Sequence, residues 1–538
     1  MMSKRNTRLN TEQKRTLLIL VIIGVLYFCA LIPANLTGAE TADMLEVFEV
    51  DEYAQYPHLI RMLTPGDSLY QTLRNFFIYL HYYYGFPFYF WSAIFVLPLK
   101  LIPGVFPDNT RVIVCVLRQC ISVLPMILSA GLLVWIATRF KRTVTAVLLD
   151  VLILTMPAVL QNDFWWHPDS LSLLFLTLTF FFLDRDRLRC GRDFLFAAAA
   201  CGAAIGTKYL GLYFCLAVPA YLICARVHGS ISTKRMFAAA GLFLAVMALF
   251  ILVSDPLLLL PQERAEIIAT MKTQTELSGV GIFLRYDSAF LEDGHLPAWL
   301  TENYLRLPML VLALAGLIRC ILRADAETRS IAIVTAVYIV TACTVNLNTA
   351  AKRLHYFLPI LLPLSVWLGF GLPREERRRR VLEALLCLCV AVQIGVNVKT
   401  DVNLYQTQLT REEDSASIAL YHTLEDEYLP LPEVPAERMT RVYRDWKAYF
   451  PEQDGYAVKT EWELADQSLI DEWHPDLILL DKENIRAYGT ASAVENAVNA
   501  DRMAGISAFY ASAAEKSIPG YSFLIENSFG MVFKKDFE

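Results

Sequence analysis

The sequence predicts an all-α, multi-pass membrane protein of about 11 transmembrane helices, with a small soluble α/β domain at its C-terminal end. Three observations predict this fold class. First, 55% of the 538 residues are hydrophobic, only 19% are charged and the mean hydropathy is +0.40, which is too apolar for an ordinary soluble enzyme. Second, the apolar residues gather in repeated runs close to the ~20 residues that a bilayer-crossing helix needs. Third, the net charge of −6 is uneven, because residues 401–538 contain 26 acidic against 12 basic side chains.

Eleven apolar runs are long enough, or nearly long enough, to cross a bilayer. The first follows a group of lysines and arginines but lacks a clean signal-peptide cleavage pattern, so we expect an uncleaved anchor. The shorter runs are typical of helices whose ends are covered by neighbouring helices rather than by lipid. The runs comprise residues 16–34, 112–138, 143–160, 170–183, 194–207, 209–225, 236–254, 304–320, 329–345, 354–371 and 381–397.

The basic residues between these runs predict the orientation, because cytoplasmic loops are enriched in lysine and arginine. With a cytoplasmic N-terminus, five basic clusters all fall on the cytoplasmic side. They are residues 139–142, 185–192, 234–235, 319–329 and 374–380. If segment 86–103 crossed the membrane, all five basic clusters would fall on the extracytoplasmic side. We therefore expect it to form an interfacial or re-entrant aromatic helix, broken by Pro87, Pro98 and Pro103.

The chemistry is then expected on the extracytoplasmic side, because the cytoplasmic loops are short, basic and otherwise featureless. Residues 1–397 are predicted to form a transmembrane catalytic domain, in which residues 35–110 are an external catalytic loop with interfacial helices. Residues 398–538 are predicted to form an extracytoplasmic soluble domain. Its strand-like runs at 475–481 and 530–533 occur together with helical stretches near residues 411–427 and 491–516, which predicts a small α/β unit.

The cysteines do not suggest a structural role. All eleven lie in or beside apolar runs, and none lies in residues 35–110 or 401–538. A disulfide framework is therefore not expected, and no Cys/His spacing predicts a zinc site.

Acidic residues are concentrated at the start of the first external loop, in the sequence EVFEVDEYAQYP. Glu46, Glu49, Asp51 and Glu52 could form a solvated acidic surface. They also lie between a membrane exit and an aromatic interfacial segment, where acids are costly and are often functional. The residues alone leave both interpretations open.

A second polar group lies in the turn QNDFWWHPDS. His167 and Asp169 follow two tryptophans that suit a membrane interface. Asp169 could cap the helix that follows it, and a capping role does not exclude a functional one.

Positively charged residues occur at two further extracytoplasmic positions. Lys208 interrupts a small-residue apolar stretch and needs a partner or an anionic ligand, unless it extends to the interface. Lys352, Arg353, His355 and Tyr356 form a cationic and aromatic cluster at the outer start of a helix. Positive charge outside opposes the orientation rule, which favours an anion such as a lipid phosphate. External carboxylates therefore face lysine and arginine side chains. A carboxylate can activate a hydroxyl nucleophile, and the cations can stabilise a departing phosphate, so this arrangement predicts a transfer reaction.

In the order of its motifs the chain resembles the GT-C membrane glycosyltransferases, particularly the bacterial branch similar to protein O-mannosyltransferases and lipid A aminoarabinose transferases. The motifs span residues 16–371, and each alone is weak. They are Asp51-Glu52 followed by Tyr53, the aromatic-proline segment from Tyr82 to Trp91, the turn His167-Pro168-Asp169, the pair Thr207-Lys208, and the late motif Arg353, Tyr356, Pro359. The sequence HYYYGFPFYFW replaces the usual Pro-Pro before the aromatic segment, and His167 replaces the usual arginine of the turn.

The resemblance implies inverting transfer of a sugar from a polyprenyl-phosphate-linked donor to a lipid, glycan or protein acceptor. It implies that Asp51 is the catalytic base or the carboxylate that orients the acceptor, with Glu52 beside it and Asp169 supporting the site. Lys208 and Arg353 would hold the donor phosphate. The remaining expected site residues are His355 and Tyr356 at the phosphate, and Tyr53, His81 and His167 at the substrate. No cofactor is certain, although a divalent metal near Asp51 is considered, and nucleic acid is not an expected partner.

Two other classes of function compete with this interpretation. A lipid or solute transporter would also place ionisable groups in membrane spans, but it would favour internal repeats and charges at mid-membrane. No internal repeat is evident, and the polar groups gather on one face. In a non-catalytic scaffold that presents the acidic tail, the acids of the first loop would be dispensable.

Overall fold

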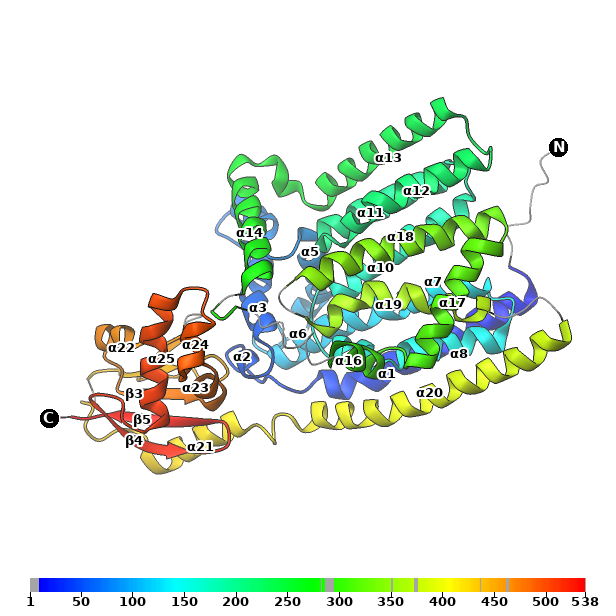
Figure 1. Cartoon of the computed structure of the whole chain (residues 1–538). Coiled ribbons are helices and arrows are strands. Elements are labelled where there is room, and N and C mark those ends of the chain that lie inside the picture. The colour runs from blue at the N-terminus through cyan, green and yellow to red at the C-terminus, as the bar shows by residue number, and fades with distance from the viewer. Residues whose placement is uncertain are drawn as a thin grey trace.

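The computed structural model describes residues 9–281, 283–285, 295–349, 352–371, 376–435, 437–460 and 464–537. A bundle of helices forms most of the chain, and a small α/β module built from its last part lies at one end of the bundle (Figure 1). We refer to this end as the module end. The predicted fold class is confirmed.

Each predicted apolar run coincides with a helix or a helical segment of the bundle. The α6 helix continues through a π-helical turn, η2, into α7, while α19 is flanked by the short turns η5 and η6. The bundle elements are α1 (Thr11–Asn35), α6 (Thr110–Leu117), η2 (Arg118–Val123), α7 (Leu124–Thr138), α8 (Thr143–Leu154), α9 (Pro157–Asp163), α10 (Asp169–Asp186), α11 (Arg192–Lys208), η3 (Leu210–Tyr213), α12 (Phe214–Val227), α13 (Thr233–Ser254), α17 (Leu307–Arg323), α18 (Ala326–Asn348), η5 (Leu354–Phe357), α19 (Leu358–Ser365), η6 (Leu368–Gly371) and α20 (Glu376–Thr410).

The number of membrane spans can be compared with the prediction only in part. Among the described residues, six helices are long and apolar enough to cross a membrane, or up to eight if each bent pair counts as one span. The two bent pairs are α8 with α9, at 60°, and α16 (His295–Asn303) with α17, at 86°. The predicted total of eleven spans stays a prediction.

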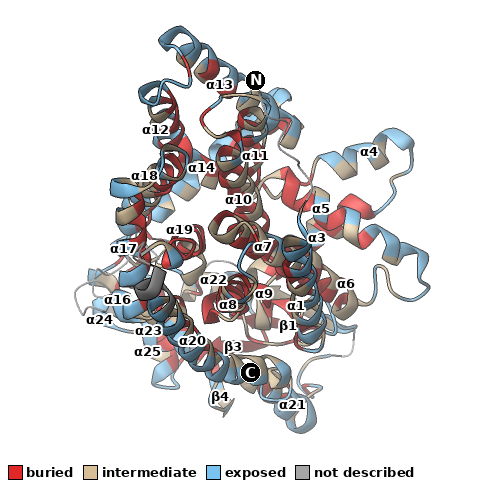
Figure 2. Cartoon of the chain, turned by 90° about the vertical axis from the view of Figure 1, so that its right-hand side faces the viewer, coloured by how far each residue is buried: buried red, intermediate tan, exposed pale blue. Residues whose placement is uncertain are grey.

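Small residues allow the central helices to pack closely. The α11 helix lies between α10 and α13, and a Cβ atom added to Gly202 would lie 2.5 Å from the carbonyl oxygen of Met247. Helices α7 and α10 are buried at the centre of the bundle, whereas α13 and α20 expose apolar side chains at its edge (Figure 2). Exposed apolar side chains on long edge helices are what a surrounding lipid phase requires.

The basic loops meet at the end of the bundle opposite the module. The guanidinium of Arg142 pairs with Glu383 at 2.8 Å, and Arg187 pairs with Glu327 at 3.5 Å. Arg235 donates a hydrogen bond to the carbonyl oxygen of Arg189 at 3.2 Å. The predicted clusters therefore share one end, although residues 374 and 375 of the last cluster lie outside the described residues.

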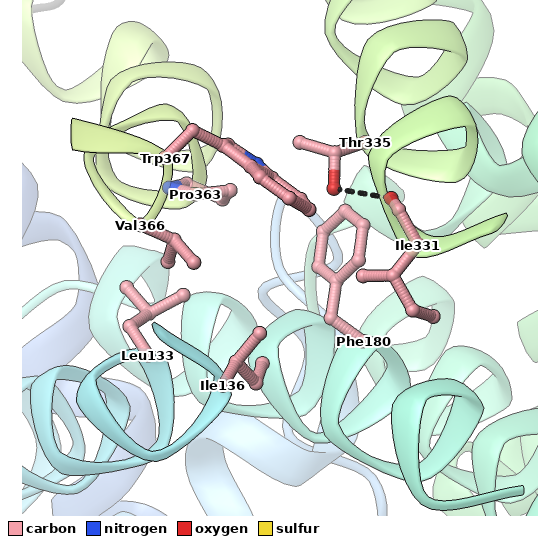
Figure 3. A pocket seen from close by; sticks show the side chains of 8 residues that line it. All are labelled: Leu133, Ile136, Phe180, Ile331, Thr335, Pro363, Val366 and Trp367. Atoms are coloured by element: carbon pink, nitrogen blue, oxygen red, sulfur yellow. Dashed lines mark hydrogen bonds between the residues drawn. The ribbon is translucent and has the colours of Figure 1, made fainter. Parts of the chain in front are cut away.

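A small apolar pocket lies in the half of the bundle nearer the basic loops, between α7, α10, α18 and the end of α19 (Figure 3). Its polar lining groups are the Trp367 indole N–H and the Thr335 hydroxyl, which donates to the Ile331 carbonyl oxygen at 2.8 Å. With no charged group in its lining, this pocket does not resemble a site for a polar reaction. The residues that line it are Leu133, Ile136, Phe180, Ile331, Thr335, Pro363, Val366 and Trp367.

The segments that the sequence places outside the membrane cover the module end. Segment 86–103 forms a short apolar helix, α5 (Phe86–Val96), and a 3-10 turn, η1 (Leu97–Leu101), consistent with a segment that does not cross. The other elements here are α2 (Leu45–Phe48), α3 (Val50–Leu63), α4 (Leu69–Phe77), η4 (Pro256–Leu259) and α14 (Pro261–Val280). Together they enclose a second apolar core, rich in tyrosine and phenylalanine.

The C-terminal module is a five-stranded mixed sheet with helices, in the strand order β2-β1-β3-β5-β4. The strand β3 is buried along its whole length, as its continuous apolar run predicts. The helix α20 runs without a break to Thr410, so the predicted domain boundary at 397/398 falls inside it. The module elements are α21 (Ala416–Tyr428), β1 (Thr440–Arg444), β2 (Tyr456–Thr460), α22 (Gln467–Trp473), β3 (Leu477–Asp481), α23 (Lys482–Tyr488), α24 (Ala491–Glu495), α25 (Ala500–Ala514), β4 (Tyr521–Glu526) and β5 (Gly530–Lys535).

Candidate active site

Asp169 is the centre of the polar cluster at the module end. It is the first residue of α10 and only 3% of it is exposed. The Lys208 ammonium, at the last residue of α11, lies 2.6 Å from Oδ1 of Asp169. Nδ1 of His167 contacts Oδ2 of the same carboxylate, and Nε2 of His355 lies 3.9 Å from it. Four predicted site residues from three separate parts of the chain therefore meet at one carboxylate.

His167 connects this cluster to the aromatic segment. Its Nε2 atom is 2.7 Å from the hydroxyl of Tyr84, and its ring stacks on Trp165 with centroids 3.7 Å apart. Burial lowers the pKa of His167. The negative charge of Asp169 acts against this shift, and the positive charge of Lys208 adds to it. A neutral imidazole that directs Nδ1–H at Asp169 leaves Nε2 to accept the Tyr84 proton.

The cationic side of the cluster extends to an exposed arginine. Lys208 lies over the rings of Tyr84, at 5.9 Å, and Tyr356, at 5.6 Å. The exposed Arg353 makes a side-chain hydrogen bond with Tyr356. Neighbouring Lys352 instead donates to the backbone carbonyl oxygens of residues 347 and 349. Lys208 and Arg353 thus meet at one tyrosine, which suits an anion that approaches between them.

Asp51, in the first turn of α3, is half-buried. Within the described part of the chain, no hydrogen bond or ion pair engages its carboxylate. Burial raises the pKa of Tyr84, and the negative charge of Asp51 raises it further, ahead of that of Asp169. The charge of Asp51 also acts on His167. Asp51 is therefore an uncommitted carboxylate close to the Asp169 cluster.

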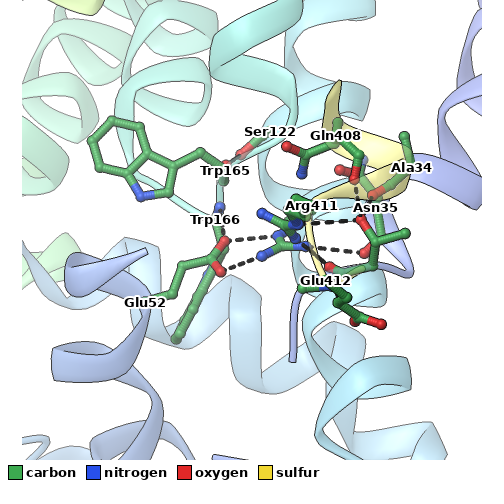
Figure 4. Close-up of polar contacts among 12 residues, drawn as sticks. Ala34, Asn35, Glu52, Ser122, Trp165, Trp166, Gln408, Arg411 and Glu412 are labelled. Atoms are coloured by element: carbon green, nitrogen blue, oxygen red, sulfur yellow. Dashed lines mark hydrogen bonds and ion pairs between the residues drawn. The ribbon is translucent and has the colours of Figure 1, made fainter. Parts of the chain in front are cut away.

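Glu52 differs from its neighbour, because both of its oxygens are occupied (Figure 4). Arg118, the first residue of η2, donates hydrogen bonds to the carboxylate from two guanidinium nitrogens, and its Nε lies 2.8 Å from Oε1. The Trp166 amide also donates to Oε1, at 2.7 Å. Arg118 completes its contacts with the carbonyl oxygens of Asn35, at 3.1 Å, and Thr37, at 3.0 Å. With its oxygens engaged and no exposed surface, Glu52 has the geometry of a positioning residue rather than of a group that touches substrate.

The other two expected substrate residues lie on different sides of the site. His81 hydrogen-bonds the hydroxyl of Tyr89 at 2.7 Å, and its ring centroid is 6.0 Å from that of Tyr84. Burial lowers the pKa of His81 to about 4. Burial raises the pKa of Tyr53, and the next contributions come from Glu46 and Arg444. The ring contact with Tyr84 brings His81 toward the Asp169 cluster, whereas the charges that act on Tyr53 are those at the contact with the C-terminal module.

The interpretation of Glu46 as solvated surface is wrong. Only 2% of Glu46 is exposed, and its carboxylate lies 2.9 Å from a guanidinium nitrogen of Arg444 in β1. A cation nearly 400 positions further along the chain accounts for this burial.

Three features of the site are not evident from the sequence: the contact of Tyr84, within the aromatic segment, with His167; the role of Arg118; and the glycine contact that aligns the site. The Gly85 amide donates to the Thr207 carbonyl oxygen at 3.1 Å, immediately before Lys208. A Cβ atom on Gly85 would lie 1.6 Å from the Gly206 carbonyl oxygen, so only glycine fits there. Neither this contact nor the partner of Arg118 has a local sequence signal, but a lone arginine inside an apolar run does predict a buried acid.

The residues around Asp51 do not fit a metal ion held by the protein alone. Such an ion needs several oxygen ligands, and among the described residues no group of three His, Cys, Asp or Glu side chains is arranged to hold one. Glu52 is engaged by Arg118. Burial, with repulsion from Glu52, raises the pKa of Glu49, which disfavours the charged carboxylate that a metal ion needs. The divalent metal considered from the sequence gains no support from these side chains.

Comparisons with known proteins agree with the motif resemblance. Residues 105–253 match the family described as dolichyl-phosphate-mannose-protein mannosyltransferase. No curated protein sequence matches the chain. ArnT from Cupriavidus metallidurans bound to undecaprenyl phosphate has a similar fold, with a TM-score of 0.55, 11% identity, and coverage of 96% of this chain and 97% of that chain. Its apo state gives a TM-score of 0.51, 12% identity and the same coverage. The Archaeoglobus fulgidus oligosaccharyltransferase in complex with Zn and sulfate gives a TM-score of 0.47, 13% identity, and coverage of 95% and 72%.

The family match and the fold shared with ArnT confirm the predicted resemblance. The chain is a multi-pass membrane protein with the GT-C fold, and the family match covers the segment from the end of the first external loop through α13.

Proposed function

We propose that this GT-C membrane protein is a glycosyltransferase that moves a sugar from a polyprenyl-phosphate-linked donor to an acceptor hydroxyl. One observation carries the proposal: Lys208, His167 and His355 surround a single buried acid, and the charge of the uncommitted Asp51 carboxylate acts on Tyr84 and His167 of this cluster. The undecaprenyl phosphate bound to the similarly folded ArnT supports a lipid phosphate as the donor group.

The reaction needs one base and a stabilised leaving group. The acceptor oxygen attacks the anomeric carbon and forms the new glycosidic bond, while the bond from that carbon to the phosphate oxygen breaks. The acceptor proton passes to Asp51, and the bonding electron pair leaves with the polyprenyl phosphate. Attack from the face opposite the phosphate inverts the anomeric carbon. A phosphate leaving group needs no general acid, so cations suffice on that side.

The cationic residues are assigned to the donor phosphate. Lys208 is held by Asp169 at 2.6 Å in the structure, and an arriving phosphate would share this ammonium. Arg353 is exposed and has the planar fork that suits phosphate oxygens. Asp169 and His167 then act as positioning residues that hold Lys208 and Tyr84. The aromatic segment, including His81 and Tyr84, would cover the sugar.

The decisive experiment measures transfer directly. Membranes that contain the protein are supplied with radiolabelled polyprenyl-phosphate sugar, and the label is followed into lipid, glycan and protein fractions. We expect incorporation that depends on the lipid-linked donor. Movement of labelled lipid between leaflets without any incorporation would instead support a transporter.

The orientation is proposed to be N-terminus inside, with the module end outside. The predicted basic clusters share the end opposite the module, and this supports the proposed orientation because cytoplasmic loops are enriched in lysine and arginine. Cysteines introduced at Asp67 and Ser230 test this in intact cells. A membrane-impermeant maleimide should label position 67 and leave position 230 unlabelled. The reverse pattern would overturn the orientation and with it the extracytoplasmic site.

The donor assignment predicts a loss of donor affinity in two variants. Removing a charged hydrogen-bond partner costs about 1.5–3 kcal/mol, so Lys208→Ala should raise the KM for the lipid donor by about 10- to 10²-fold. Arg353→Lys should also raise it, because a point charge cannot replace the fork. Lys352→Ala is the matched control, because that ammonium is turned to backbone carbonyls. If Lys208→Ala and Arg353→Lys both keep wild-type rates at limiting donor, the phosphate binds elsewhere.

A further inference from the structure

The C-terminal module contacts the first external loop through a buried ion pair. Arg444 ends β1, and its Nη2 atom lies 2.9 Å from Oε2 of Glu46 in α2. The two side chains are 4% and 2% exposed. Arg444 also donates from Nη1 to the Ala448 carbonyl oxygen at 2.7 Å, which fixes it within the module.

Apolar and backbone contacts surround this ion pair. Ile418 and Tyr449 of the module pack against the aromatic core of the external loops. The Glu452 amide donates to the Asp43 carboxylate at 3.3 Å. The charges of both Glu46 and Arg444 act on the Tyr53 hydroxyl. The contacts therefore flank the segment from Asp43 to Tyr53, which contains Asp51.

A second contact joins the module to the loop that follows α14. The Val498 amide donates to the Phe283 carbonyl oxygen at 3.0 Å, and the Arg285 amide donates to the Asn496 carbonyl oxygen at 2.7 Å. Leu284 pairs with Ala497 in an antiparallel bridge. The module thus holds two separate external segments at the same end of the bundle.

The position of Asp51 depends on these contacts, because its own carboxylate has no described partner to hold it. Its place is set by the backbone of α2 and α3, where Glu52 anchors one side to Arg118 and Glu46 anchors the other to the module. A buried ion pair stabilises a fold weakly but specifies one arrangement strongly, because a displaced partner leaves an unpaired buried charge.

We infer that Arg444 is a positioning residue of the active site: its ion pair with Glu46 fixes α2 and α3, and so places the Asp51 carboxylate. The module is then a required part of the catalytic unit rather than an appended domain. This inference rests on the proposed role of Asp51 as the base. It concerns kcat and not donor binding, since the donor cations belong to the bundle.

Single and double variants of the full-length protein test the inference. Small displacements of a catalytic group can cost about 10²-fold in rate, so Glu46→Gln and Arg444→Met should each lower kcat by about 10- to 10²-fold. The KM for the lipid donor should stay within twofold. The double variant should lose less than the product of the two single losses, because neither charge is left unpaired. Arg441→Met is the matched control, since the side chain of this exposed arginine on the same strand donates within the module, to the Trp473 carbonyl oxygen at 3.0 Å.

Hydrogen–deuterium exchange provides a readout that does not depend on activity. We expect faster exchange in residues 44–53 of Glu46→Gln and Arg444→Met, and wild-type exchange in Arg441→Met. Unchanged exchange and an unchanged kcat in the two single variants would overturn the positioning role, even if Asp51→Asn is inactive. Faster exchange in the two single variants, together with a wild-type protein that shows no transfer, would support the contact and reject the glycosyltransferase proposal instead.

Discussion

Asp51→Asn should lower the initial rate of sugar transfer by about 10²–10⁴-fold, the usual contribution of a positioned base. The amide keeps the size and much of the hydrogen bonding of the carboxylate but cannot accept the acceptor proton. Donor affinity should largely survive, because Lys208 and Arg353 are untouched. The measurement is the initial rate in nanodiscs at matched protein levels, with saturating lipid donor.

Asp67→Asn is the matched control for this variant. Asp67 lies in the same external loop but is exposed, so its neutralisation should leave the rate within twofold. A rate within twofold of wild type for Asp51→Asn would remove the base assignment and would restore the transporter or scaffold interpretation.

Glu52→Gln should destabilise the protein by about 3–5 kcal/mol, because it leaves Arg118 buried without its counter-charge. Arg118 is 1% exposed and Glu52 is fully buried, so water cannot replace the lost partner. The bidentate ion pair joins the start of α3 to η2. The hydrogen bond from the Trp166 amide joins the same carboxylate to the turn before His167. Thermal unfolding in detergent, followed by size-exclusion chromatography, measures the loss.

An exposed ion pair at the same end of the chain supplies the control. Glu40 pairs with Arg111 at 3.1 Å, and the two side chains are 68% and 35% exposed. Glu40→Gln should therefore change the stability by less than about 1 kcal/mol. If Glu52→Gln unfolds like wild type yet loses turnover per folded molecule, Glu52 acts on the reaction itself and the positioning assignment is wrong.

The sequence predicted the helical bundle well because two physical limits act on each span separately. Hydrocarbon thickness sets the length of an apolar run, and the charge rule sets which ends carry arginine and lysine. The strands β1, β2 and β4 were not predicted. They are short, and their alternation of polar and apolar residues is too brief to distinguish them from loops, whereas β3 is a continuous apolar run.

The site could be predicted only where a residue is unusual for its own surroundings. Lys208 in a small-residue helix and Asp169 at a membrane turn stand out locally, and the structure joins them. The states of Glu46 and Glu52 are set by Arg444 and Arg118, far along the chain. A carboxylate looks the same in the sequence whether it is solvated, paired or poised for reaction, so these roles required the fold.

Contacts between the first external loop and residues near the C-terminal end of the chain affect the order in which the protein assembles during biosynthesis. Arg411, just after α20, bonds the Thr37 hydroxyl at 3.2 Å across 374 positions of sequence, and Arg444 reaches Glu46 from still further along. The first external loop emerges from the ribosome long before either arginine is translated, so it must wait, with an unpaired carboxylate, for the last quarter of the polypeptide. A prematurely terminated chain would insert its early spans and still lack the contacts of the module. If the proposed function holds, only molecules whose translation has reached the module then consume the lipid-linked sugar.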